Sequence, residues 1–206
     1  MKLYEGLPIY ELVVDNETDG LTYISLVKDP AIQSNFLCFS DIEKKHQFSI
    51  QNEEKRIVSG LAMRANYPIY RVNEKGEEFY VTFSKETIRL LVEKFFTEQR
   101  TLAVNLEHSL DVNDVTIIES YFVDESRGLK PNDIPEAKDG DWFVTIKINN
   151  DDIWNEIKKG NIRAFSVQGY FDIKDIEVPP SPTVSEIKQI EELQEDIYDI
   201  IYKIIK

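Results

Sequence analysis

Short runs of β-branched and aromatic residues, separated by turn residues and prolines, recur along most of the chain. Several of these runs alternate between apolar and polar positions, which is the period of a half-buried β-strand. The alternation is clearest in the segment Trp142-Phe143-Val144-Thr145-Ile146. By this pattern we expect strands over residues 9–14, 21–27, 56–63, 69–72, 79–83, 102–106, 115–123, 142–148 and 162–173.

Two segments change to the period of an α-helix. After Ser84, apolar residues fall at helical spacing on one face, and Ser84 itself is a suitable N-cap with Thr87 at the third helical position. Asn149-Asn150-Asp151 predicts the start of a second, shorter helix over residues 152–159, which Gly160 ends. Two helices among many strands predict an α+β fold for residues 1–177.

The end of the chain differs from the rest. Residues 178–185 contain Val178-Pro179-Pro180-Ser181-Pro182, which cannot enter a helix or a central strand and predicts an extended linker. Residues 186–206 then place large aliphatic side chains on one face of an amphipathic helix. Because this stripe has no partner within its own segment, we expect it to dock on the domain or on another chain.

Composition and charge narrow the class of protein. The chain has 206 residues, 42% hydrophobic and 11% aromatic, which is typical of a globular domain. Its net charge of -14 disfavours binding to nucleic acid phosphates. The single cysteine, Cys38, has no intramolecular disulfide partner, and no His or Cys cluster has the spacing of a metal site, so we expect no cofactor. No apolar run reaches membrane-spanning length and the first residues lack a signal sequence, which predicts a cytoplasmic protein that binds no membrane.

The chain contains few histidines, which limits the candidates for a general base. The chain has two histidines, and His46 lies in a charged stretch, whereas His108 follows the predicted strand 102–106. A serine hydroxyl is a weak nucleophile until a positioned base removes its proton. His108 is therefore the main candidate for a general base near neutral pH, and Ser166, within the apolar sequence Ala164-Phe165-Ser166-Val167, is a candidate nucleophile.

The order of these elements resembles the phage prohead proteases, which mature the capsid, and in particular the XkdF-like phage serine proteases. The similarity extends over roughly residues 7–173. Four segments carry it: Ile24-Ser25-Leu26-Val27-Lys28-Asp29-Pro30-Ala31-Ile32; Val104-Asn105-Leu106-Glu107-His108; Glu119-Ser120-Tyr121-Phe122-Val123; and Gly140-Asp141-Trp142-Phe143-Val144 through Gly160 to the stretch Ala164–Phe171.

The resemblance implies a fold similar to the herpesvirus assemblins, a small, mostly antiparallel β-barrel wrapped by helices. It implies a serine endopeptidase with Ser166 as nucleophile and His108 as general base. The expected partners are the phage scaffold and the major capsid protein, together with a second copy of the chain in a dimer. The expected place of action is the host cytoplasm, inside the procapsid.

The third catalytic residue is less well defined by the resemblance. Herpesvirus enzymes use a second histidine after the serine, and this chain has none there. An acidic residue is then needed to orient His108, and Glu119 matches a glutamate of the closer phage relatives. Glu77 or Glu78 lies where other prohead proteases place an acid, whereas Glu107 would point away from His108 if both lay on a strand.

Two classes of function remain open from the sequence. The first is the serine endopeptidase, in which Arg163 is a candidate for stabilising the oxyanion. The second is a catalytically inactive scaffold or capsid-assembly protein of the same fold. The missing second histidine favours the inactive protein slightly, and the presence of both His108 and Ser166 favours the enzyme more.

Overall fold

A computed structural model describes residues 2–28, 49–52 and 55–176. In these ranges the chain is α+β, with two α-helices and 13 strands, as the hydrophobic pattern predicts. Two short 3₁₀ helices span Arg100–Leu102 and Glu125–Arg127. Cys38, His46, the predicted linker and the predicted C-terminal helix lie outside the described residues.

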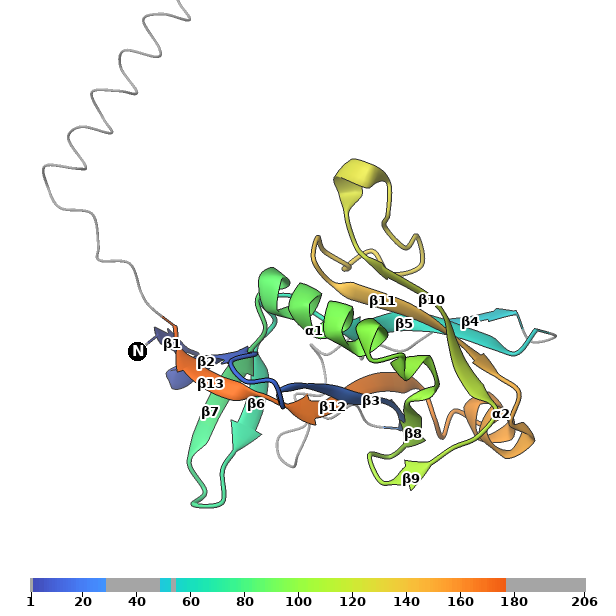
Figure 1. Ribbon diagram of the computed structural model, residues 1–206, viewed down its shortest axis with the longest axis horizontal. Coiled ribbons are helices and arrows are strands. Elements are labelled where there is room, and N and C mark those ends of the chain that lie inside the picture. The colour runs from blue at the N-terminus through green and yellow to red at the C-terminus, as the bar shows by residue number, and fades with distance from the viewer. Residues whose placement is uncertain (1, 29–48, 53–54, 177–206) are drawn as a thin grey trace, which may run out of the picture. The chain divides into compact units, whose positions relative to one another are not determined.

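The sheet that carries the candidate residues has four strands in the order β12-β3-β8-β9. Their bounds are β3 Gly20–Val27, β8 Val104–Leu106, β9 Leu110–Asp111 and β12 Ala164–Tyr170. The central strand β3 pairs antiparallel with β12 and parallel with β8. Segments far apart in the sequence are thereby held side by side by backbone hydrogen bonds (Figure 1).

A second sheet of four strands, in the order β10-β11-β5-β4, is antiparallel throughout. Its strands are β4 Ser49–Asn52, β5 Ile57–Met63, β10 Val115–Phe122 and β11 Trp142–Ile148. One face of β11 places Trp142, Val144 and Ile146 in the main hydrophobic core. Phe143, on the other face, packs in a smaller cluster with Ile134 of the loop before β11. Both faces of β11 are therefore buried.

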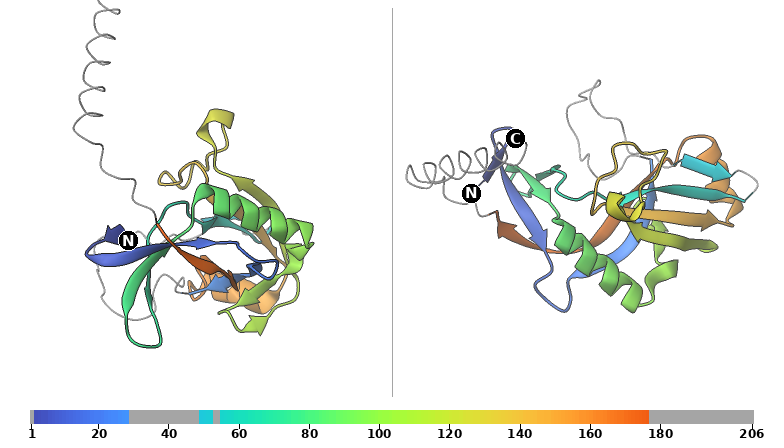
Figure 2. Two further views of the ribbon diagram at one scale, coloured as in Figure 1. Left: turned by 60° about the vertical axis from the view of Figure 1, so that its left-hand side comes forward. Right: turned by 90° about the horizontal axis from the view of Figure 1, so that it is seen from above.

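The third sheet has five strands and follows the order β1-β2-β7-β6, with β13 also paired to β2. Its strands are β1 Lys2–Tyr4, β2 Leu7–Val13, β6 Ile69–Val72, β7 Glu78–Thr82 and β13 Asp172–Asp175. The β6–β7 hairpin projects away from the helix α1 in Figure 1 and in the left view of Figure 2.

The expected closed barrel is not formed by the described strands, and this corrects the fold implied by the resemblance. Each of the three sheets ends in strands that pair on one side only. A barrel requires the first and last strands of one sheet to pair with each other. Here the chain changes sheet repeatedly, and the strand predicted over residues 162–173 divides into β12 and β13, which belong to different sheets. Only two α-helices accompany these open sheets in the described part of the chain.

Helix α1 begins where the sequence predicts, and helix α2 begins and ends one residue earlier than predicted. Helix α1, Lys85–Thr97, is capped by Ser84, whose hydroxyl accepts the backbone N–H of Thr87. Its buried face contacts the core, and the ring of Phe95 packs edge-on against Trp142 at 5.9 Å between centroids. Helix α2, Asp151–Lys158, is capped by the side chain of Asn150, which accepts the N–H of Ile153. Helix α1 thus joins the core to the sheet that carries β3 (Figure 1).

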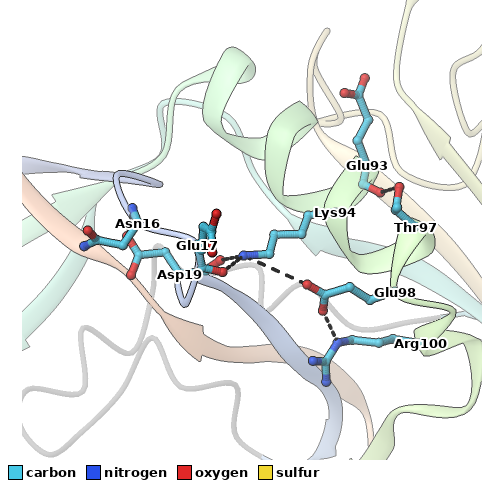
Figure 3. A network of polar contacts seen from close by, with 8 residues as sticks. All are labelled: Asn16, Glu17, Asp19, Glu93, Lys94, Thr97, Glu98 and Arg100. Carbon is cyan, nitrogen blue, oxygen red and sulfur yellow. Dashed lines mark hydrogen bonds and ion pairs between the residues drawn. The ribbon is translucent and has the colours of Figure 1, made fainter.

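A polar network holds the turn before β3 against the end of α1 (Figure 3). The ammonium group of Lys94 donates to the backbone carbonyls of Glu17 and Asp19, and it also lies 3.9 Å from the carboxylate of Glu98. The buried carboxylate of Asp19 accepts the N–H groups of Asp15 at 2.9 Å and Asn16 at 3.1 Å. These contacts fix the start of β3, the strand that leads to the candidate site.

Candidate active site

Three polar residues lie in a row across β12, β3 and β8. Ser25 is paired with Ser166 on its antiparallel neighbour and with Asn105 on its parallel neighbour. Paired residues in a sheet point to the same face, with Cβ atoms about 4.5–5.5 Å apart in an antiparallel pair. All three are buried, whereas the adjacent residues Ile24 and Phe165 belong to the hydrophobic core. Alternation along the strands therefore separates a polar face from the core face.

His108 lies in the turn that joins β8 to β9, at the end of a strand as the sequence predicts. The turn is closed by the N–H of Ser109, which donates to the carbonyl of Leu106 at 3.1 Å. Its two central residues, Glu107 and His108, have φ of 50° and 57°. Positive φ at both positions defines a type I′ turn, which normally favours Asn and Gly because larger side chains are strained there. The backbone of His108 therefore adopts a strained conformation.

The imidazole of His108 reaches back to β3. Its Nδ1 lies 2.8 Å from the hydroxyl oxygen of Ser25, which is a hydrogen bond in either tautomer. The other ring nitrogen, Nε2, is buried and has no hydrogen-bond partner in the part of the chain that the structure describes. The ring is thus hydrogen-bonded through Nδ1 alone among the described residues.

Glu107 fastens the same turn to the end of β3. Its carboxylate accepts the backbone N–H of Lys28 at 2.7 Å, and its own N–H donates to the carbonyl of Leu26 at 3.1 Å. Because both residues lie in a turn, the strand alternation that would place Glu107 opposite His108 does not apply. The charge of Glu107 raises the pKa of His108, and the hydrogen bonds of Glu107 hold the turn that carries the imidazole.

The environment of His108 favours the neutral imidazole. Partial burial lowers the pKa of His108, the carboxylate of Glu107 opposes this by raising it, and the guanidinium of Arg71 on β6 lowers it further. The net pKa lies below the ordinary value of 6.5. A histidine with a lowered pKa carries a free lone pair at neutral pH, as a general base must.

A second polar contact crosses the same face of the sheet. The side-chain amide of Asn105 donates to the amide oxygen of Gln168 at 3.0 Å, which links β8 to β12 across β3. The side-chain oxygen of Asn105, Oδ1, is buried without a hydrogen-bond partner among the described residues. A buried acceptor without a donor is uncommon, and Asn105 is the residue paired with Ser25 in the neighbouring strand.

Ser166 and His108 come from distant segments and are both neighbours of Ser25. Both residues lie in the described ranges, and the hydroxyl of Ser166 makes no hydrogen bond to the ring of His108. Ser166 is 8% exposed, whereas Ser25 is fully buried at 0%. The arrangement therefore contains one histidine and two serines, of which the more exposed serine is not bonded to the ring.

The acidic candidates lie elsewhere. Glu119 is exposed on β10, in a different sheet, where burial of Tyr121 and, after it, the charge of Glu119 raise the pKa of Tyr121. Glu77 accepts the side-chain amide of Asn73 at 2.7 Å, and Glu78 accepts the hydroxyl of Tyr70, both at the β6–β7 hairpin. Among the acids named from the sequence, Glu107 is the one whose charge is found to act on His108.

Arg163 is engaged at the end of β3, where its Nε donates to the carbonyl of Lys28 at 3.0 Å. This contact gives the side chain a structural role beside β12.

The described ranges contain no cluster of three or more His, Cys, Asp or Glu side chains that would hold a metal ion. In the same ranges no helix has the length and apolar character needed to cross a bilayer.

Ser25 and Asn105 are the site residues that sequence reasoning missed. Both lie in segments that carry the family resemblance, but a serine or an asparagine within an apolar strand has no recognisable spacing relative to His108. The available signal was polarity at positions flanked by core residues on both sides, as in Ile24-Ser25-Leu26 and Val104-Asn105-Leu106. Buried polar residues of this kind require partners, and here the partners come from other strands.

Comparison with known proteins agrees with the resemblance. Residues 44–175 match the protein family described as "Putative phage serine protease XkdF". The matched range contains both His108 and Ser166, whereas Ser25 precedes it. No curated protein and no solved structure matches the chain. Because the match covers more than half of the sequence, the chain belongs to this XkdF family.

Proposed function

We propose that this protein is a serine endopeptidase that works through an acyl-enzyme. The Ser166 oxygen bonds to the scissile carbonyl carbon while His108 takes the hydroxyl proton. The C–N bond then breaks as His108 returns this proton to the leaving amine. Water, deprotonated by the same histidine, hydrolyses the acyl-enzyme and restores the Ser166 hydroxyl.

The single observation that carries the proposal is the hydrogen bond from the His108 ring to one member of a cross-strand serine pair. Paired residues point to the same face of a sheet, so the pairing of Ser166 with Ser25 supports a position of Ser166 on the face where His108 binds Ser25. Loose geometry between nucleophile and base is common before substrate binds. The lowered pKa of His108 supports the role of base, since the ring is neutral at neutral pH.

Ser166 is favoured over Ser25 as the nucleophile. A nucleophile must reach a substrate carbonyl, and Ser166 keeps a small exposed fraction of 8% whereas Ser25 has none. Ser166 also lies within the residues that match the serine protease family, and Ser25 does not. Its hydroxyl makes no hydrogen bond to a described residue, so no existing contact must be broken before attack.

The substrates we propose are the scaffold and the major capsid protein of the phage, cut inside the procapsid during maturation in the host cytoplasm. Membership of a phage serine protease family supports this assignment. We further propose that the active form is a homodimer and that the amphipathic stripe of residues 186–206 contributes to assembly, because such a stripe must bury its apolar side chains.

Processing in cells tests the function. The full chain would be co-expressed with the scaffold and major capsid proteins of the same phage, as wild type and as Ser166→Ala, His108→Ala and the double variant. We expect each single variant to abolish cleavage and the double variant to be no worse, since residues that act as one unit are non-additive. Unchanged cleavage in either single variant would refute the enzyme mechanism.

The second candidate is the catalytically inactive assembly protein. The near-complete burial of both serines favours it, because a substrate carbonyl has little access to the site in this conformation. This alternative predicts that wild type and Ser166→Ala support equal particle assembly and that neither cuts the scaffold. The same co-expression experiment therefore separates the two functions.

A further inference from the structure

We propose that Ser25 is a positioning residue that holds His108 in the tautomer with the proton on Nδ1, in the place where other serine peptidases use an acid or a second histidine. This inference rests on the proposed function, in which Nε2 of His108 is the base. It gives a role to a residue outside the range that matches the family.

The position of Ser25 is fixed by the sheet. Its strand, β3, is paired with β12 on one side and with β8 on the other. In this register Ser25 lies opposite Ser166 and Asn105. The side chain is fully buried, and its oxygen lies 2.8 Å from Nδ1. A short side chain on a central strand has little freedom to move, so it is well placed to orient a ring that comes from a turn.

The surroundings of Nε2 favour one tautomer of the ring. If Ser25 donated to Nδ1, the proton of the neutral ring would lie on Nε2, where it would be buried with no acceptor among the described residues. If Nδ1–H donates to Ser25, Nε2 carries only a lone pair, which the reaction uses. An unsatisfied buried donor is costly, so the second arrangement is favoured.

Asn105 completes the arrangement. When the Ser25 oxygen accepts from Nδ1–H, its own proton needs an acceptor. The carbonyl oxygen of Asn105, on the strand paired with Ser25, is a buried acceptor with no partner in the described structure. Its amide is already directed toward Gln168, to which it donates at 3.0 Å. In the proposed arrangement the Ser25 hydroxyl turns its proton toward the side-chain oxygen of Asn105, which accepts no hydrogen bond from a described residue.

The acidic residues do not compete for this role. The carboxylate of Glu107 is bonded to the N–H of Lys28, and Glu119 is exposed in a different sheet. A neutral hydroxyl orients the ring without the strong charge that would raise the pKa of His108. This is consistent with a lowered pKa, for which burial is the leading cause.

Nitrogen NMR of the full chain tests the tautomer directly. Histidine would be labelled with ¹⁵N in a His46→Gln background, so that the ring signals come from His108 alone. At a pH where the ring is neutral, we expect Nδ1 protonated and Nε2 unprotonated. Ser25→Ala should move the proton toward Nε2, the tautomer preferred by the free histidine side chain. If the His46→Gln protein, which keeps Ser25, carries the proton on Nε2, the proposal is overturned. This result does not depend on whether Ser25→Ala folds.

Kinetics separate this inference from the proposed function. We expect Ser25→Ala to lower kcat about tenfold, because one neutral hydrogen bond is lost, with KM unchanged and partial rescue by Ser25→Thr. An unchanged kcat in Ser25→Ala refutes the positioning role while Ser166→Ala, which should abolish activity, still tests the peptidase. If the wild type cleaves nothing but the NMR tautomer is as expected, the proposed function fails and the hydrogen-bond assignment stands.

Discussion

Ser25 and Ser166 are directly opposite each other in the β3–β12 pair, and only Ser25 is hydrogen-bonded to His108. The pairing thus places two serine side chains on one face of the sheet, and His108 is hydrogen-bonded to one of them. The two serines differ in exposure, and under the proposed mechanism the fully buried Ser25 orients the ring whereas Ser166 attacks the substrate. The sheet achieves with backbone register what many serine peptidases achieve with loops.

The pH dependence of kcat/KM should report the lowered pKa of His108. Protonation removes the lone pair, so activity is present above the pKa and is lost as the pH falls through it. Because burial lowers this pKa, we expect the acid limb to have its midpoint below the ordinary histidine value of 6.5. A midpoint above 6.5 would show that the charge of Glu107 dominates over burial.

Two charge variants should move this limb in opposite directions. Glu107→Gln removes a charge that raises the pKa of His108 and keeps an acceptor for the N–H of Lys28, so the limb should shift to lower pH. Arg71→Gln removes a charge that lowers the pKa, so the limb should shift to higher pH. Shifts of the same sign in both variants would contradict this account of the site.

Glu119→Gln should leave kcat and KM unchanged. The side chain is exposed on β10 and makes no hydrogen bond to a described residue, so it has no route to the imidazole. Exposed substitutions of this kind also change the free energy of unfolding by less than about 0.5 kcal/mol. A large loss of turnover would instead restore Glu119 as the residue that orients His108, and would require a different conformation of the site.

Gly169→Ala should lower both stability and activity. A Cβ atom at this position would lie 2.3 Å from the backbone carbonyl oxygen of Gly20, so β12 and β3 would have to separate. We expect a loss of about 1–3 kcal/mol in the free energy of unfolding, the usual range for overpacking, measured by chemical denaturation. Gly160→Ala is the matched control, because a Cβ there meets nothing within 4 Å and carries only the penalty of its positive φ. Equal losses in the two variants would exclude the steric explanation.

Lys94→Met should destabilise the fold without changing the chemistry. The variant keeps most of the aliphatic stem but loses the donors to Glu17 and Asp19 shown in Figure 3. We expect a loss of about 1–2 kcal/mol in unfolding free energy and unchanged kcat for the folded enzyme. Lys159→Met removes an exposed pair with Glu156 and should cost less than about 0.5 kcal/mol. A larger loss for Lys159 than for Lys94 would be contrary to this view of the network.

Local patterns explain which features were predictable from the sequence. The strand β11 and the helix cap Ser84 were predicted correctly, and the second cap, Asn150, lies within the predicted capping segment 149–151, because alternation and capping depend on neighbouring residues. The pairing of β3 with β8 and β12 depends on residues far apart in the chain, and no local period encodes it. For that reason the sequence identified His108 as a strand-end residue but not its partner Ser25, and it suggested a closed barrel where the described sheets are open.

Labelling with a fluorophosphonate tests the central claim most directly. The reagent phosphonylates an activated serine with loss of fluoride, and peptide mapping of the full chain identifies the modified residue. We predict modification of Ser166, abolished in Ser166→Ala and His108→Ala and slowed but still at Ser166 in Ser25→Ala. Modification of Ser25, or equal modification of Ser166 with and without His108, would contradict the assignment of Ser166 as the nucleophile activated by His108.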